Sequence, residues 1–501
     1  MNASPQPNMN INDTTPLHKG GLQQKPDRKT EPNWSVVVIG GGPAGMMAAI
    51  MAASTLKEQC PGGKVLLLEK SDRPGRKLLI TGNGRCNLTN CRFSDPSDPR
   101  PQDVRLFCDS FGKRGRFLMS AIGGFGIQDT IRFFEDRGLG LKTEAGGRVF
   151  PETDRSADVL DVLMRAMWEK GVTVQTNARV EGFIVGGLKK GSVGQELEPQ
   201  GSESKESGTK KGPENRFITT VNVMQQGKQW AIRTKSVILC TGGKSIPATG
   251  SSGDGYDFSA TLGHTISNPR PGLVSLRMKE EWTGELAGVS IGGAKVIAVQ
   301  GGKKLVKGQG EILFTHDGLS GPAILNMSRE LGGVLVGETG EFLEPFTIRI
   351  DLLPEFDHQD LDRKLQHNFM ANGDRMAGNC LEGFVPRKVA HQLVKLAGIE
   401  NRWKINTITR EQRQSLIKLL KGLELTVIEH GGWDRAMITV GGVSLKEIEA
   451  KTMRSKIVSN LYLAGEILDI DGPTGGYNLQ ACWSTGHLAG KSAGEGEQMV
   501  E

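Results

Sequence analysis

The chain has 501 residues, enough for about two to four domains with a large buried core. Its 62 basic and 56 acidic residues leave a formal charge of +6, which is too balanced to indicate a nucleic-acid partner by itself. The seven cysteines are scattered and include no CxxC pair, which argues against a disulfide framework or a zinc finger and favours a reducing compartment. Residues 1–33 are polar and lack the apolar core of a signal peptide, so we expect a disordered tail on a cytoplasmic protein.

The first predicted element is a buried strand that runs into a glycine cluster. Residues 36–39 are three valines and an isoleucine, which is typical of a strand buried on both faces. Gly40, Gly42 and Gly45 follow with G-x-G-x-x-G spacing. Residues 46–53 are good helix formers. In this setting Gly40 makes the tight turn, Gly42 leaves room for a pyrophosphate and Gly45 lets the helix pack on the strand.

Two other interpretations of this stretch are weaker. A membrane span over residues 36–56 is disfavoured, because Gly-Gly-Gly-Pro would break a helix near its middle. A glycine-rich turn without a ligand fits less well, because a second strand, 64–68, ends at Glu69. That carboxylate is well placed to accept hydrogen bonds from a ribose hydroxyl. Strand, glycines, helix, second strand and acid together predict a dinucleotide site.

The loop over residues 70–90 is dense in Gly, Asn, Arg and Lys. Ligands of open α/β sheets lie beyond the carboxyl ends of the strands, so we expect this loop to lie against the cofactor. The alternative is a solvated basic loop. We expect cations to face phosphates and amides to meet a polar ring edge: Arg76, Lys77 and Arg85 in the first group, Asn83 and Asn87 in the second.

Cys86 and Cys91 have the C-x4-C spacing of the redox dithiol in disulfide reductases. Such enzymes usually carry a second glycine fingerprint for a pyridine nucleotide, and we find none later in the chain. We therefore prefer a lone Cys86 that packs in the core or contacts a ring of the cofactor.

The middle of the chain alternates helices and strands around one polar segment. Residues 186–216 are rich in Gly, Ser, Lys, Glu and Pro, and we expect a disordered insertion there. The predicted elements are a helix at 156–169 with Ser156 as N-cap, strands at 172–175 and 179–185, a hairpin of 217–224 and 229–233, a strand at 237–240 that meets Thr241 and Gly242, and a helix at 256–262 capped by Asp254. The start of that last helix points at the cofactor or is a plain capped turn.

Residues 273–354 are predicted to form a β-rich domain and residues 355–421 a helical one. The strands expected in the first are 295–299, 304–306, 311–315 and 346–352. Between residues 355 and 424 there are 12 basic and 9 acidic side chains. This excess is compatible with a nucleic-acid surface, but a solvated helical face is the simpler interpretation.

The C-terminal region holds a third junction between a strand and glycines. An apolar strand at 461–464 meets Gly465, and Gly475-Gly476 opens a helix through residues 481–489. The helix N-terminus could hold the negative charge that develops at N1 and O2 of a reduced flavin ring.

These segments resemble the BaiN/YhiN-like family of FAD-dependent oxidoreductases, also labelled aminoacetone-oxidase-like or dehydro-bile-acid-reductase-like. The resemblance covers residues 35–490. It rests on five motifs in the family's order: V-V-V-I-G-G-G-P-A-G, G-R-K-L-L-I-T-G-N-G-R-C-N-L-T-N, C-T-G-G-K-S-I-P, F-T-H-D-G-L-S-G-P and G-E-I-L-D-I-D-G-P-T-G-G-Y-N-L-Q.

The resemblance implies an α/β fold: a glutathione-reductase-like FAD-binding Rossmann domain with an inserted β-barrel-like domain and a small helical domain. The implied boundaries are 34–272 and 422–495 for the FAD-binding domain, 273–354 for the β-rich insert and 355–421 for the helical insert. The FAD contacts implied by the resemblance are Gly40, Gly42, Gly45, Glu69, Lys77, Gly82, Asn83, Arg85, Val180, Thr241, Gly242, Gly465, Asp469, Gly476, Tyr477 and Asn478. No metal is expected.

The expected activity is a two-electron transfer through FAD N5, with hydride received from NAD(P)H and passed to a small organic acceptor, such as a conjugated enone, or to oxygen. Two alternatives stay open: an RNA-modifying flavoprotein and a non-catalytic FAD-binding redox sensor. No spacing assigns a catalytic acid or base, and packing against the ring is preferred over proton transfer for Cys86 and Tyr477. We expect a small-molecule substrate, no nucleic acid and no membrane, and make no prediction of oligomeric state.

Overall fold

The computed structural model describes residues 30–93, 104–188, 215–335, 337 and 342–496. Most of the expected tail and of the expected insertion lies outside these residues. At their edges, strands continue further than expected, because Thr30 pairs with Ala231 and Leu188 pairs with Asn215. Residues 30–33, 186–188 and 215–216 therefore belong to strands, since backbone pairing needs no apolar side chain.

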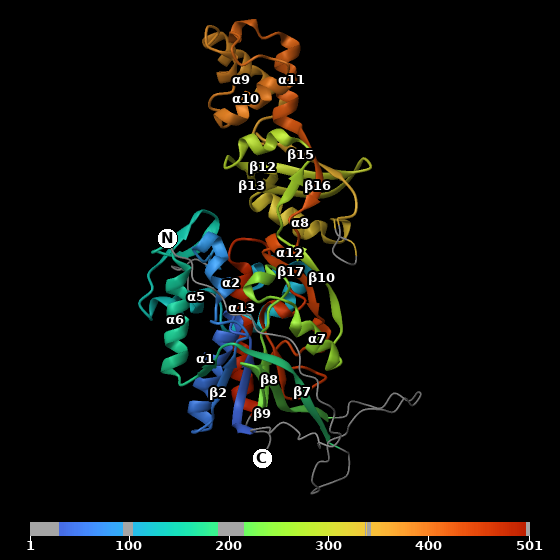
Figure 1. The fold of residues 1–501 in the computed structure, drawn as a ribbon. Helices are drawn as coiled ribbons and strands as arrows, with labels where there is room; N and C mark the ends of the chain where they lie inside the picture. Colours follow the sequence, from blue (N-terminus) through green and yellow to red (C-terminus); the bar gives the residue numbers. More distant parts are fainter. Residues whose placement is uncertain (1–29, 94–103, 189–214, 336, 338–341, 497–501) are drawn as a thin grey trace, which may run out of the picture.

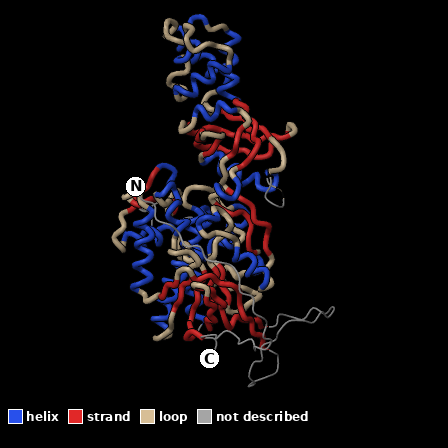
Figure 2. Tube along the Cα trace, in the orientation of Figure 1, coloured by secondary structure: helices blue, strands red, loops and turns tan. Residues whose placement is uncertain are grey.

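A seven-stranded sheet forms the centre of the larger unit (Figures 1 and 2). Its order is β6-β2-β1-β9-β8-β7, and β18 also pairs with β9. The strands β6, β2, β1, β9 and β18 are parallel, whereas β7, β8 and β9 form an antiparallel meander. The bounds are β1 (Thr30–Ile39), β2 (Val65–Leu68), β6 (Thr173–Gln175), β7 (Ala178–Leu188), β8 (Asn215–Gln225), β9 (Lys228–Leu239) and β18 (Leu461–Leu463).

The helices α1 (Pro43–Gln59) and α13 (Tyr477–Glu495) cross in close contact beside this sheet. Glycines on α13 permit the approach: a Cβ on Gly486 would lie 2.3 Å from the Ala44 carbonyl oxygen, and one on Gly490 would lie 2.2 Å from that of Ala48. The other helices of this unit are α2 (Arg76–Ile80), α3 (Val104–Asp109), α4 (Met119–Gly124), α5 (Ile127–Glu135), α6 (Ser156–Glu169), α7 (Asp254–Thr261) and α12 (Gly432–Arg435).

Two small sheets complete the unit. The strands β3 (Thr89–Asn90), β5 (Arg148–Pro151) and β4 (Leu141–Glu144) form one, and β10 (Ile266–Gly272) with β17 (Ile438–Val443) forms the other. Within the described residues no helix is both long and apolar enough to cross a membrane.

The inserted barrel predicted from the resemblance is confirmed as a closed barrel in the order β11-β14-β13-β12-β15-β16. Its bounds are β11 (Leu276–Met278), β12 (Ser290–Gln300), β13 (Lys303–Phe314), β14 (Gly318–Ser320), β15 (Phe346–Asp351) and β16 (Leu423–His430), and α8 (Pro322–Leu335) packs on β13. The strands expected at 304–306 and 311–315 are one strand, β13. The expected restart of the FAD-binding domain at 422 is too early, because β16 closes the barrel against β11 and β15.

The helical insert consists of α9 (His358–Ala371), α10 (Arg387–Leu396) and α11 (Arg410–Gly422). Figure 1 shows these helices at the end of the barrel that lies away from α13. They share one hydrophobic core with the barrel, in which Leu361, Leu393 and Leu416 are buried together with Ile348 and Leu425 of the strands. The β-rich and helical inserts were expected to be separate domains, but in the structure they share one core.

Candidate functional site

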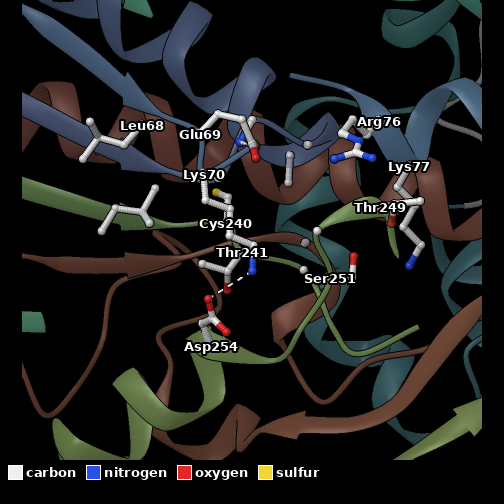
Figure 3. A pocket seen from close by; sticks show the side chains of 18 of the residues that line it. Leu68, Glu69, Lys70, Arg76, Lys77, Cys240, Thr241, Thr249, Ser251 and Asp254 are labelled. Atoms are coloured by element: carbon white, nitrogen blue, oxygen red, sulfur yellow. Dashed lines mark hydrogen bonds and ion pairs between the residues drawn. The ribbon is translucent and has the colours of Figure 1, made fainter. Parts of the chain in front are cut away.

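A cleft that encloses about 920 Å³ lies where β1, β2 and β9 end (Figure 3). Its position beyond the carboxyl ends of parallel strands is where ligands of open α/β sheets lie. Eight of the residues predicted to contact the cofactor line it: Gly40, Gly42, Glu69, Lys77, Val180, Thr241, Gly242 and Gly465.

The glycine turn between β1 and α1 has the geometry of a nucleotide-binding turn. Gly40 has φ +102°, and a Cβ there would lie 2.4 Å from the Cys240 carbonyl oxygen. A Cβ on Gly45 would lie 1.9 Å from the Gly40 carbonyl oxygen, so this glycine allows α1 to pack on the turn and does not line the cleft. At Gly42 no described atom lies within 4 Å of such a Cβ. That space opens into the cleft and is free for a ligand.

The N-terminus of α1 also faces this space. Gly42 is the N-cap, no side chain caps the helix, Pro43 begins it, and its first turn has no acidic residue. Uncapped N–H groups at the positive end of a 17-residue helix attract an anion by about 0.3–2 kcal/mol. The turn therefore fits a pyrophosphate.

Glu69 lies in the cleft wall with its carboxylate already held by the backbone. Its Oε2 accepts a hydrogen bond from Gly41 N at 2.8 Å, and Oε1 accepts one from Ser71 N at 2.7 Å. Each carboxylate oxygen has a second lone pair, so Glu69 can still accept from a ribose hydroxyl. The two backbone bonds orient it for that purpose.

Thr241, at the end of β9, has a buried hydroxyl without a hydrogen-bond partner among the described residues. It lines the same cleft. The oxygen lies against α7, since a Cβ added at Gly255 would be 1.9 Å from Thr241 Oγ1, so the hydroxyl faces that helix and not the open cleft.

A second cavity of about 710 Å³ shares Pro43, Lys77, Gly465, Glu466 and Cys482 with the first, so the two cavities adjoin. Its remaining walls are mainly apolar: Leu78, Met437, Ile438, Ile470, Leu479 and Ala481, with Thr81, Thr439, Asn478 and Thr485. A glycine-lined chamber beside a more apolar one fits the two halves of a flavin dinucleotide.

Lys77 and Glu466 form an ion pair at the junction of the two cavities. Lys77 Nζ lies 2.7 Å from Glu466 Oε2 and 2.5 Å from Ser245 Oγ. Burial raises the pKa of the Glu466 carboxyl, but the Lys77 charge and the hydrogen bonds from Ser245 and Thr439 outweigh it, and the pKa is lowered. The pair is therefore ionised. Sequence analysis overlooked Glu466, although it directly follows Gly465 in the last motif.

Only two of the three cations predicted to face phosphates in the 70–90 loop lie at the cleft. Arg76 and Lys77 line the cleft, but Arg85 lies outside both cavities. Its guanidinium pairs with Glu144, lies 2.7 Å from Asp154 Oδ1 and stacks over Phe150 at 4.1 Å. The sequence analysis expected Arg85 to face a phosphate. In the structure its guanidinium is instead bound by these two carboxylates.

The remaining predicted contacts of this loop, Gly82 and Asn83, line neither cavity and are exposed. Both have φ +57° and form the bend that follows α2. Asn87 also lies outside the cavities and keeps a buried Oδ1 without a partner among the described residues.

Of the C-terminal residues predicted to contact the cofactor, Gly465 and Asn478 line the cavities. The Asn478 side chain accepts from Gly472 N at 2.8 Å and donates to Gly472 O at 3.0 Å, which fixes the preceding loop. Tyr477 instead stacks on Phe107 with the ring centroids 5.0 Å apart. It therefore packs in the core.

The last two predicted contacts, Asp469 and Gly476, have structural roles in the loop before α13 and at the start of α13. Asp469 accepts from Ser267 Oγ at 2.8 Å and lies 3.1 Å from Arg114 Nη2. Gly476 is the N-cap of α13 with φ +100°, and a Cβ there would lie 2.3 Å from the Thr89 carbonyl oxygen. The N-terminus of α13 thus lies beside the apolar cavity, next to Asn478.

Two predicted caps are wrong. Arg155 is the N-cap of α6, and the Ser156 hydroxyl donates to the Leu79 carbonyl at 2.7 Å, joining α6 to α2. Gly253 is the N-cap of α7, and Asp254 lies 3.0 Å from Lys70 Nζ in the cleft wall (Figure 3).

The dithiol hypothesis has no support in the structure. All seven cysteines are free, and neither Cys86 nor Cys91 lines either of the two cavities described above. Burial raises the pKa of the Cys86 thiol to about 12, so it stays protonated and unreactive. Packing, one of the two roles expected for Cys86, agrees with its complete burial.

The fold and the cleft together define an FAD-binding Rossmann protein, and comparison with known proteins places it. The family model described as "HI0933-like protein Rossmann domain" matches residues 34–492, so the chain belongs to this family of FAD-dependent oxidoreductases. The chain is 31% identical over 459 residues to a 3-dehydro-bile acid delta(4,6)-reductase of Clostridium scindens, covering 91% of this chain and 98% of that protein.

Two further relatives carry a different name. A ribosomal RNA dihydrouridine synthase of Escherichia coli is 28% identical over 90% of this chain and 96% of its own length, and one of Haemophilus influenzae is 27% identical over 91% and 97%. Among solved structures, a 3-ketosteroid-delta4-(5alpha)-dehydrogenase of Rhodococcus jostii is similar with a TM-score of 0.48 at 15% identity, covering 94% of this chain and 98% of that one.

Proposed function

We propose that the two adjoining cavities hold FAD and that the chain uses NAD(P)H to reduce a small organic acceptor that contains a polarised double bond. The observation that carries the proposal is that a glycine-lined anion site at α1 adjoins an apolar cavity, with Lys77 and Glu466 lining both. The name of the bile acid reductase, a relative at 31% identity, supports a reduction of this class.

The residues of the cleft would divide the work of holding FAD. Glu69 would accept from the adenosine ribose, and the turn at Gly42 with the α1 N-terminus would hold the pyrophosphate. Asn478 would fix the loop against the ring cavity. Bound there, FAD supplies two-electron transfer through N5.

The chain's own groups would tune that chemistry electrostatically. The N-terminus of α13 places a partial positive charge beside the apolar cavity, whereas the charge of Lys77 there is balanced by Glu466. The helix N-terminus would favour the form of the cofactor that has accepted electrons. The apolar walls at Leu78, Ile470 and Leu479 exclude water from the ring, which strengthens these interactions.

The test is anaerobic addition of NADH and then NADPH to the purified yellow holoprotein. Bleaching of the flavin bands by either nicotinamide is the expected result, and a screen of enone acceptors would follow by reoxidation. Flavin bands that persist with both reductants overturn the NAD(P)H-driven proposal and leave the FAD site standing.

RNA modification is the second candidate. Two relatives that align over nine-tenths of the chain are named ribosomal RNA dihydrouridine synthases. Saturating a uracil and saturating an enone are both hydride additions to a conjugated double bond, so one flavin site could serve either substrate. Salt-dependent retention of ribosomal RNA in a filter-binding assay is expected if this candidate is right, and its absence would remove it.

A further inference from the structure

The hairpin of β12 and β13 carries a concentration of basic side chains on the barrel. Between residues 290 and 311 the chain has four lysines, Lys295, Lys303, Lys304 and Lys307, and one acid, Glu311. All four lysines are exposed. The hairpin therefore has a strong positive charge although the whole chain is nearly balanced.

The strand register brings three of these lysines to one face. Lys307 lies opposite Ile297, and Lys304 lies opposite Val299. Residues opposite each other share a face, as do residues two apart, so Lys295 joins them beside Ile297. Lys303 follows at the tip opposite Gln300 and so lies on the other face. We call Lys295, Lys304 and Lys307 the basic face.

No carboxylate neutralises the basic face within the described part of the chain. Elsewhere on the barrel, Arg349 pairs with Glu424 at 2.7 Å and Arg277 with Glu429 at 2.6 Å. Asp351 lies opposite Lys295 in the register, but its carboxylate is bound to Lys421 at 2.8 Å. Like charges this close on a sheet repel one another, and a bound polyanion would relieve the repulsion.

We propose that the basic face binds the phosphate backbone of RNA. This inference deepens the second candidate function and rests on it for the identity of the polyanion. A membrane surface fits less well, because interfacial segments usually add apolar anchors and none of the exposed large hydrophobic side chains lies between residues 290 and 311. The face binds without reading base sequence, since ammonium groups contact phosphates as point charges.

The experiment measures the affinity of the holoprotein for an oligouridylate of about 16 nucleotides, the upper site size of a small barrel, over a series of salt concentrations. Three lysine–phosphate contacts with a single strand give a slope of log K against log salt of about −2.1. The double variant Lys304→Gln/Lys307→Gln should reduce that slope to about −0.7, because each contact contributes about 0.7.

Two matched variants remove the same charge elsewhere. Lys388→Gln/Lys395→Gln acts on α10 of the helical insert, and Lys57→Gln/Lys170→Gln acts on α1 and the end of α6. Both should keep the wild-type slope. A slope that falls only with the α10 variant, or equally with all three, overturns the assignment of the basic face. Equal binding of polyglutamate overturns RNA as the partner. None of these results depends on reduction by NAD(P)H, which is measured separately.

Discussion

Arg329 of α8 and Asp471 of the FAD-binding unit are joined by two contacts, Nε to Oδ1 at 2.5 Å and Nη2 to the Asp471 carbonyl at 2.8 Å. Asp471 is 6% exposed and also lies 3.0 Å from Arg114 Nη1. It directly follows Ile470, which lines the apolar cavity. The barrel insert therefore holds the loop that forms one wall of the apolar cavity.

Breaking this contact from either side should weaken FAD binding. Arg329→Gln and Asp471→Asn should each raise the Kd for FAD about tenfold, equivalent to ~1.4 kcal/mol, because an unpaired buried charge displaces the loop. The double variant should have the same Kd for FAD as each single variant, because both substitutions remove the same interaction. Flavin fluorescence titration of the apoprotein measures all three values.

Arg349→Gln is the control for this prediction, because it removes an exposed ion pair of the same barrel. It should leave the Kd unchanged. Wild-type affinity in Arg329→Gln would show that the barrel does not position the loop.

Lys77→Met should destabilise the apoprotein at pH 7 by about 3 kcal/mol, because it leaves the buried Glu466 carboxylate without its cation. The Glu466 pKa is lowered in the folded protein, so the pair stabilises the fold above the carboxyl's ordinary pKa of 4.5 and this contribution is lost as the pH falls below it. Urea unfolding of both proteins at pH 7 and near pH 4 should show the difference shrinking at acid pH. A difference independent of pH would mean that Lys77 stabilises by packing alone.

His487 predicts a second pH dependence. Its ring stacks on Phe125 with the ring centroids 4.6 Å apart. Burial is the largest cause that lowers the His487 pKa from 6.5 to about 4, and the charge of Lys491 lowers it further. The carboxylate of Asp129 has the opposite, smaller effect. The neutral ring stabilises the fold above pH 6.5, and this contribution is lost as the pH falls toward 4.

His487→Phe should retain the stack and lose less stability than the wild type between pH 7 and pH 5, measured by urea unfolding of the apoprotein. His358→Gln, at the exposed start of α9, is the control and should follow the wild-type profile. Identical slopes in wild type and His487→Phe would assign the acid sensitivity to other groups.

The parts of the fold that sequence analysis predicted depend on local patterns. The four apolar residues 36–39, the glycines after them and the acid at Glu69 lie within one short βαβ unit, whose geometry follows from its own residues. The motifs extended this prediction to the barrel insert, which the closed sheet confirms.

The errors arise where distant residues meet. The positive charge of Arg85 suggested a phosphate ligand. Its actual partners, Glu144 and Asp154, lie in another part of the chain, so the sequence around Arg85 does not reveal them. Glu466 acquires its role from Lys77, 389 residues earlier. Likewise β16 follows the whole helical insert before it closes the barrel. Local pattern carries no signal for such pairings.

Gly42 provides the most direct test of the claim that this cleft holds FAD. Because no described protein atom lies within 4 Å of a Cβ at Gly42, Gly42→Val should fold like the wild type, whereas Gly45→Val should not, since its Cβ would collide with Gly40. We predict that the wild type purifies with stoichiometric FAD and that soluble, cooperatively folding Gly42→Val purifies without it, because the new side chain occupies the place of the pyrophosphate. Stoichiometric FAD in folded Gly42→Val would contradict the site.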